Sequence, residues 1–267
     1  MASSFWNGEF YFNNIRSSAF KVCIVDVDEN NMLKQIGTSY ALNLEQEETI
    51  ANRKWYREGE VSSDNLIIQL CRTDGKKWNT SDLMEINKWL FTENFCRFQT
   101  SDFATASLNI VYYLKAVSMK KFFTSNMYGY IEVEFQPYEP YAYIIPNTSY
   151  TFSTTNNTAT KSLYSYSNLY RQYKPIIKVT NRGGQTDEIL IKNNTTQKEG
   201  LRIKGIPTNK TYIIDCQMGT IIDQADGSNK FSSLVNCNFL GLQSGDNNIH
   251  IEGNVIVEFM CEFPIIL

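Results

Sequence analysis

The sequence predicts a mainly β protein: an N-terminal β-rich domain with one helix, followed by a C-terminal β-sandwich. Aromatic residues make up 13% of the 267 residues, and flat side chains pack well on pleated sheets. Short apolar runs recur along the chain with turn residues between them, a pattern typical of antiparallel strands. One segment has a clear helical spacing of apolar residues, over roughly 82–92.

The chain opens with two short β-type runs, which hold Phe10, Phe12, Ile15, Phe20, Val22 and Ile24. Asn13-Asn14 lies between them and is followed by the polar residues 16–18. Because Asn readily takes left-handed backbone angles, this pattern predicts a strand, a tight turn and a second strand.

The rest of the first half contains four further strand candidates and the helix. The strands are predicted at 37–44, 66–71, 108–117 and 128–135. Asp82 is expected to cap the helix, and Glu85, three residues later, can complete a capping box. The helix should bury one face, formed by Leu83, Ile86, Trp89 and Leu90.

A proline-rich segment, 137–146, predicts a domain boundary, because proline removes backbone donors and ends sheets. The expected domains are 1–145 and 146–267. Residues 147–172, rich in Ser, Thr, Asn and Tyr, form either a linker or exposed strands with long loops. The remaining strands, in a sandwich or jelly roll, are predicted at 175–179, 188–192, 212–215, 219–223, 248–251 and 254–263.

Composition excludes several classes of function. The formal net charge is −3, so no electrostatic clamp on nucleic acid is expected. No stretch approaches the roughly 20 apolar residues of a membrane helix. The first residues have neither a basic nor an apolar region, so no secretory signal is expected.

The six cysteines contain no C-x-x-C pair, and most lie inside apolar runs. They are expected to be reduced, buried thiols of a protein made in a cytoplasm. A disulfide framework or a zinc site remains the alternative.

No catalytic residue, cofactor or metal site is predicted. His250, the one histidine, is expected on the outward face of a strand, and it cannot by itself supply a catalytic triad or a zinc site.

Asp26, Asp28 and Asn30 have the spacing of a calcium-binding loop, but the later loop positions do not fit, which favours a solvated turn. Two acidic pairs, each expected on one strand face, indicate solvent-facing surfaces rather than a hydrolytic cleft: Glu132/Glu134 and Glu258/Glu262.

Several motifs, taken in order, resemble the distal tail protein of long-tailed (siphovirus-type) phages. The opening, 10–22, is similar to that family's F-x-F-N-G-x-x-S-x-D-F-G-V start, with Asn14, Ala19 and Lys21 where Gly, Asp and Gly are usual. Residues 53–59 occupy the place of an arginine- and glycine-containing turn, without its usual proline. Similar segments continue at 87–91, 112–116, 129–138, 214–216 and 242–249.

This resemblance implies a structural, non-enzymatic protein of the virion tail tip, made in the bacterial host cytoplasm. The N-terminal domain would form a homo-hexameric ring with a central channel for DNA, between the tail tube protein and the tail-tip or baseplate hub protein. The resemblance places Arg53, Trp55 and Arg57 at the oligomer interface, and an exposed loop is the alternative for these residues. A galectin-like C-terminal domain would dock receptor-binding or accessory proteins.

The resemblance implies no cofactor, no sequence-specific nucleic acid binding and no membrane insertion. Two other hypotheses remain open. One is a monomeric carbohydrate-binding or adhesion module with Tyr-lined loops. It lacks support from tryptophan, because all four tryptophans fall in the N-terminal half. The other is a hydrolase using Glu132 or Glu258.

Overall fold

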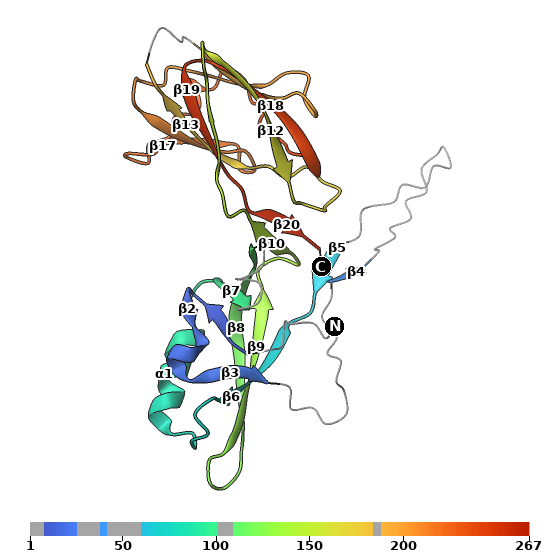
Figure 1. The fold of residues 1–267 in the computed structure, drawn as a ribbon, viewed down its shortest axis with the longest axis vertical. Helices are drawn as coiled ribbons and strands as arrows, with labels where there is room; N and C mark the ends of the chain where they lie inside the picture. The colour runs from blue at the N-terminus through green and yellow to red at the C-terminus, as the bar shows by residue number, and fades with distance from the viewer. Residues whose placement is uncertain (1–7, 26–37, 42–59, 101–108, 184–187, 267) are drawn as a thin grey trace, which may run out of the picture. The chain divides into compact units, whose positions relative to one another are not determined.

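The computed structural model describes residues 8–25, 38–41, 60–100, 109–183 and 188–266. The chain divides into two compact units, Met1–Ala142 with Ile266–Leu267, and Tyr143–Ile265. The structure is mostly β, as the sequence predicts, and the described residues include one α-helix, α1 (Thr80–Leu90) (Figure 1). No helix among these residues is long and apolar enough to cross a membrane.

One antiparallel sheet organises the N-terminal unit. Its strands lie in the order β2-β1-β7-β8-β9-β6-β3. The bounds are β1 (Phe10–Phe12), β2 (Ile15–Arg16), β3 (Val22–Val25), β6 (Leu66–Arg72), β7 (Cys96–Thr100), β8 (Asn109–Phe123) and β9 (Gly129–Pro137). The sheet curves back on itself: the Ile24 N–H of the edge strand β3 donates to the carbonyl of Gly8, just before β1, at 2.9 Å. A separate pair is formed by β4 (Thr38–Ala41) and β5 (Glu60–Ser63).

The opening turn is confirmed, but the strand that follows it differs from the prediction. Asn13 and Asn14 both have positive φ, at 50° and 61°, as a two-residue hairpin turn requires. The returning strand is only the short β2, followed by the 3-10 helix η2 (Ser17–Phe20). Lys21 then takes a left-handed conformation. The predicted run at 20–24 therefore becomes β3, which pairs with β6 rather than with β1.

The core of this unit lies on the inner face of the sheet, beneath α1. Strand residues in alternation point into it, and the helix adds its predicted apolar face, all four members of which are buried. The largest of the strand contributions are Phe10, Phe12, Ile68, Leu70, Phe98, Leu114 and Phe135.

Helix α1 begins two residues earlier than predicted and has a different cap. The side chain of Asn79 accepts a hydrogen bond from the Asp82 N–H at 2.8 Å, so Asp82 belongs to the first turn and is not the cap. Several residues in this stretch are good N-caps. Asn79 is the cap because the preceding residue, Trp78, is fixed to the β8–β9 hairpin. The Trp78 N–H donates to the Met127 carbonyl.

The C-terminal unit is built from two antiparallel sheets, in the orders β11-β19-β13-β16-β17 and β12-β18-β14-β15. The bounds are β11 (Tyr150–Ser153), β12 (Thr158–Ser165), β13 (Ile176–Asn181), β14 (Glu188–Asn193), β15 (Leu201–Lys204), β16 (Thr211–Asp215), β17 (Thr220–Asp223), β18 (Gly245–Glu252) and β19 (Val255–Met260). The 3-10 helix η3 (Phe231–Ser233) precedes β18, and β10 (Ala142–Ile145) pairs with β20 (Phe263–Ile265).

Residues 147–172 contain the strands β11 and β12, the second of the two alternatives left open for this segment. Most other strands of this unit fall where the sequence predicts them, with the following differences. Strand β15 is not predicted. Gly245-Asp246 opens β18 instead of marking a turn. Glu262 lies beyond the end of β19, so it does not share a strand with Glu258.

Candidate functional site: the hairpin of the N-terminal unit

The described residues hold no group of three or more His, Cys, Asp or Glu placed to bind a metal ion. His250 lies on the outer face of β18, with Nδ1 2.8 Å from the Thr160 hydroxyl and Nε2 3.0 Å from a Glu252 oxygen. On β9, Glu132 accepts a hydrogen bond from Lys120 at 3.3 Å, and Glu134 accepts one from the Asn65 amide at 2.7 Å. These polar groups form contacts along the sheet surface rather than across a cleft.

The interface residues implied by the resemblance, Arg53, Trp55 and Arg57, lie outside the described residues, and so do those of the possible calcium loop at 26–30. Both assignments stay predictions. The prediction of buried thiols holds only in part: Cys216 and Cys261 are buried, Cys23, Cys71 and Cys96 are half-buried, and Cys237 is exposed.

The most distinctive surface feature of the N-terminal unit is the long hairpin of β8 and β9, which projects beyond the rest of the sheet (Figure 1). Strand β8 runs for 15 residues, six beyond the predicted end. The register with β9 shifts between Ala116 and Ser118, so Val117 forms a bulge. At the turn, the Thr124 N–H donates to the Tyr128 carbonyl at 2.8 Å.

Trp78 fastens the end of this hairpin to the start of α1. Its N–H donates to the Met127 carbonyl at 2.8 Å, and its indole Nε1–H donates to the Gly129 carbonyl at 2.9 Å. Its ring also stacks on Phe123, with centroids 5.8 Å apart. Gly129 has φ +147°, and a Cβ there would lie 1.9 Å from the Phe122 carbonyl oxygen. This close approach therefore needs glycine.

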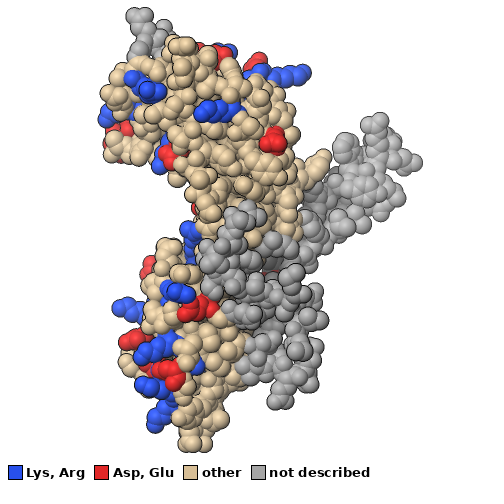
Figure 2. Space-filling view, viewed as in Figure 1, with Lys and Arg blue, Asp and Glu red and all other residues tan. Residues whose placement is uncertain are grey.

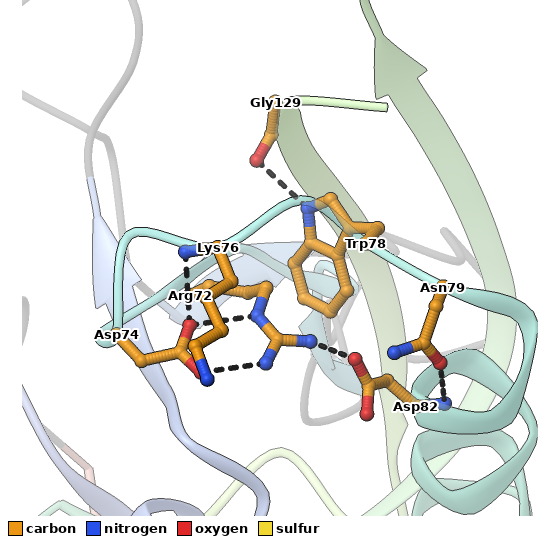
Figure 3. Close-up of polar contacts among 7 residues, drawn as sticks. All are labelled: Arg72, Asp74, Lys76, Trp78, Asn79, Asp82 and Gly129. Carbon is orange, nitrogen blue, oxygen red and sulfur yellow. Dashed lines mark hydrogen bonds and ion pairs between the residues drawn. The ribbon is translucent and has the colours of Figure 1, made fainter. Parts of the chain in front are cut away.

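Arg72, at the end of β6, holds the same corner together (Figure 3). Its guanidinium donates two hydrogen bonds to the Asp74 carboxylate, at 2.8 and 2.7 Å, and a third to Asp82 in the first turn of α1. It also lies over the Trp78 ring, 5.7 Å from the centroid. Only 7% of the Arg72 side chain is exposed. These contacts of Arg72 and Trp78 join β6, α1 and the hairpin, and together they support the hairpin.

The ion pair between Arg72 and Asp74 makes the stability of this corner of the N-terminal unit sensitive to acid. The hydrogen bonds from Arg72 hold the pKa of Asp74 well below its usual range. A carboxyl whose pKa is lowered by folding contributes its full stability above its unfolded pKa of about 4. This contribution shrinks as the pH falls below that value and disappears only below the lowered folded-state pKa. We expect Asp74→Asn to be less stable than the natural protein at pH 7, and the difference to shrink steadily as the pH falls from about 4 to about 2. Urea unfolding at several pH values measures this convergence, and a stability difference that is independent of pH would contradict it.

The end of the hairpin carries exposed aromatic and apolar side chains. Phe122 and Tyr130 stack with centroids 4.8 Å apart and an interplanar angle of 14°, and Phe122 remains 43% exposed. Met127 and Tyr128, in the turn, are also exposed. We call these four residues the hairpin surface. Figure 2 shows few charged groups at the tip of this unit, which makes the hairpin surface a candidate interaction site.

The sequence predicts only part of the hairpin surface. The second predicted strand, 128–135, includes Tyr128 and Tyr130, but the first was predicted to end at Val117, and Lys120 and Lys121 interrupt the apolar pattern before Phe122. One pattern in the sequence does indicate that the strand continues past Val117. Ser118, Lys120 and Phe122 stand at every second position, which places all three on one face of a strand.

Comparisons with known proteins agree with this architecture. Residues 6–137 match the family model "Phage tail protein N-terminal domain", and residues 141–261 match "Phage tail C-terminal domain". A search of curated proteins found no match.

Two solved structures share the fold over nearly the whole chain. The Dit protein of phage SPP1, described as a paradigm of the hub adsorption apparatus in phages that infect Gram-positive bacteria, matches with a TM-score of 0.62 and 10% identity, over 96% of this chain and 99% of that one. A chain of the activated phage p2 baseplate matches with a TM-score of 0.51 and 9% identity, over 94% and 97%. The chain belongs to the phage tail proteins, with the N-terminal and C-terminal domains of that family in sequence, and it has the fold of the Dit distal tail protein.

Proposed function

We propose that this protein is the distal tail hub of its phage, forming a homo-hexameric ring at the tail tip. The ring joins the tail tube protein on one side to the tail-tip or baseplate hub protein on the other. The observation that carries the proposal is the shared fold with SPP1 Dit, a hub protein, across both units. The two family matches, which together cover most of the chain, support it.

The hairpin surface suits the subunit interface of such a ring. A ring needs a heterologous contact, in which one patch meets a different patch on the next copy and the rotation closes. Phe122 and Tyr130 offer a compact aromatic patch on a strand pair. The network around Arg72 and Trp78 fixes that strand pair to α1, so little conformational entropy is lost on binding.

The remaining roles follow from this arrangement. The C-terminal units dock receptor-binding or accessory tail proteins, and the central hole of the ring passes DNA. A net charge of −3 per chain suits a conduit, because each phosphate that a basic lining bound would add affinity and slow the genome. The protein acts structurally and not as an enzyme.

The test is the mass of the purified full-length chain by light scattering behind size exclusion, at micromolar concentration. Six chains of 30.8 kDa give about 185 kDa, and negative-stain electron microscopy should then show a central hole. If the chain alone is monomeric, the measurement is repeated with the tail tube protein of the same phage. A chain that stays monomeric in both samples contradicts the proposal.

A carbohydrate-binding module without a ring is the second candidate. The observation that favours it is Tyr164, which is half exposed, contacts Tyr166 edge-on with centroids 5.0 Å apart, and lies at one end of the polar outer face of β12 and β18. Sugar rings stack on aromatic side chains of this kind. A monomer that binds host cell-wall glycan, and loses that binding on Tyr164→Ala, would favour this candidate over the ring.

A further inference from the structure

Two cysteines face each other across the strand pair β3–β6. Cys23 and Cys71 are direct partners in the register of these antiparallel strands. Each alternates with buried core residues, Val22 and Ile24 on β3 and Leu70 on β6. Both thiols therefore point to the outer face of the sheet, where both residues are half-buried. Burial and, after it, the nearby Cys23 raise the pKa of Cys71, which is consistent with two thiols in close proximity.

The hydrogen bonds of this strand pair show which kind of pair the two cysteines form. The Thr73 N–H donates to the Lys21 carbonyl at 2.8 Å, two residues along each strand from the cysteines. In an antiparallel ladder this pattern repeats every second residue. Between these positions, the Ile24 N–H points away from β6, toward Gly8. Cys23 and Cys71 thus form a hydrogen-bonded pair.

The spacing of such a pair suits a covalent link. The Cα atoms of a hydrogen-bonded antiparallel pair are about 5.5 Å apart. Disulfides form across Cα separations of roughly 4.4–6.8 Å, most often about 5.5–6 Å. Side-chain rotation can therefore bring the two sulfur atoms together while the strand pairing is kept.

We propose that Cys23 and Cys71 are a redox-modifiable pair, and that they form a cross-strand disulfide when the assembled particle leaves the reducing bacterial cytoplasm. Disulfides persist in oxidising surroundings and are rare in the cytosol. A phage tail protein meets both environments: the reducing cytoplasm during assembly and oxidising surroundings after release.

The oxidant is a small-molecule disulfide, such as oxidised glutathione, and the reaction proceeds in two exchanges. The thiolate of one cysteine attacks the small disulfide, forms a mixed disulfide and releases one small thiol. The thiolate of the other cysteine then attacks the protein sulfur of the mixed disulfide and releases the second small thiol. The two protein thiols lose two electrons and two protons, and the small disulfide is reduced to two thiols.

The bond would strengthen the N-terminal unit. It would close a loop of roughly 50 residues, a length at which the chain-entropy model gives a substantial gain in stability. It would also lock β3 to β6, and β6 leads directly into the Arg72 network that supports the hairpin. We expect the melting transition of the N-terminal unit to rise by on the order of 10 °C, while that of the C-terminal unit stays unchanged.

The experiment uses the full chain with Cys237→Ser, because the exposed Cys237 thiol could otherwise link two molecules. The substitution leaves five of the six cysteines. The protein is incubated with oxidised glutathione, or with dithiothreitol as the reduced control. Free thiols are blocked with iodoacetamide in denaturant, so that the buried Cys216 and Cys261 also react. The protein is then digested without reduction, and the peptides are identified by mass spectrometry. Scanning calorimetry is run on the same two samples.

We expect a Cys23–Cys71 linked peptide, three alkylated thiols in place of five, and the shift in the melting transition, all reversed by dithiothreitol. Adding Cys71→Ser, or Cys23→Ser, should leave all four remaining thiols free and remove the shift. Five free thiols after oxidation, or a link between any other two cysteines, would overturn the proposal. The first measurement requires no change at Cys23 or Cys71, so a variant that failed to fold would not affect it.

Discussion

Replacing Trp89 with alanine should lower the free energy of unfolding of the N-terminal unit by about 4 kcal/mol, within the range for removing a buried Trp. The indole is 5% exposed and stacks on Phe20 and Phe10, with centroids 4.3 and 5.4 Å apart. Its Nε1–H donates to the Phe12 carbonyl at 3.0 Å. The substitution therefore opens a large cavity between α1 and the sheet, and it leaves a buried carbonyl of β1 without this donor.

Urea unfolding followed by tryptophan fluorescence measures the loss, because all four tryptophans lie in the N-terminal half of the chain. Met84→Ala is the matched control. It changes an apolar residue of the same helix that is 67% exposed, and we expect it to alter stability by less than about 0.5 kcal/mol. A loss below about 1 kcal/mol for Trp89→Ala would mean that α1 does not pack on this sheet in solution.

Features governed by neighbouring residues were predictable from the sequence. Two adjacent asparagines are sufficient to specify a tight turn, and both have positive φ in the structure. The apolar face of α1 follows from its helical spacing, and its four predicted members are buried. The mainly β fold follows in the same way from short runs of β-type residues between turns.

Features that depend on distant partners were not predictable. The pairing of β3 with β6 joins segments almost fifty residues apart, and the local pattern of β3 fits the hairpin strand equally well. The helix cap depends on Trp78, whose own partners, Met127 and Gly129, lie far along the chain. Strand β15 has only two buried positions, Leu201 and Ile203, which is too few for a reliable period-2 pattern.

The candidate site shows the same division. Phe122 and Tyr130 belong to strands that were predicted at nearly the right places, but their stacking requires the register of the β8–β9 pair. Arg72 forms its bonds to Asp74 and Asp82 only because the chain turns between β6 and α1. The residues of the hairpin surface were visible in the sequence, and their shared location depended on the fold.

The second large effect is expected at the hairpin surface and rests on the proposed ring. The double variant Phe122→Ser with Tyr130→Ser should reduce the measured mass from about 185 kDa to that of the single chain, 30.8 kDa. Exposed aromatic residues contribute disproportionately to interfaces, often 2 kcal/mol or more each. A closed ring repeats the same contact at each subunit boundary. Losing two such side chains at each boundary would weaken each contact by roughly a thousandfold, enough to dissociate a ring at micromolar concentration.

Two controls separate a lost interface from a lost fold. Circular dichroism and the melting temperature of the double variant should stay close to those of the natural protein, because neither side chain belongs to the core. Tyr170→Ser removes an aromatic residue that is 99% exposed on the C-terminal unit and should leave the ring intact. If the double variant remains a hexamer, the hairpin surface does not form the subunit contact. Its exposed aromatic pair, supported from beneath by Arg72 and Trp78, would then be free to meet the tail tube or the tail tip, and a binding assay with each partner would identify which of the two loses affinity.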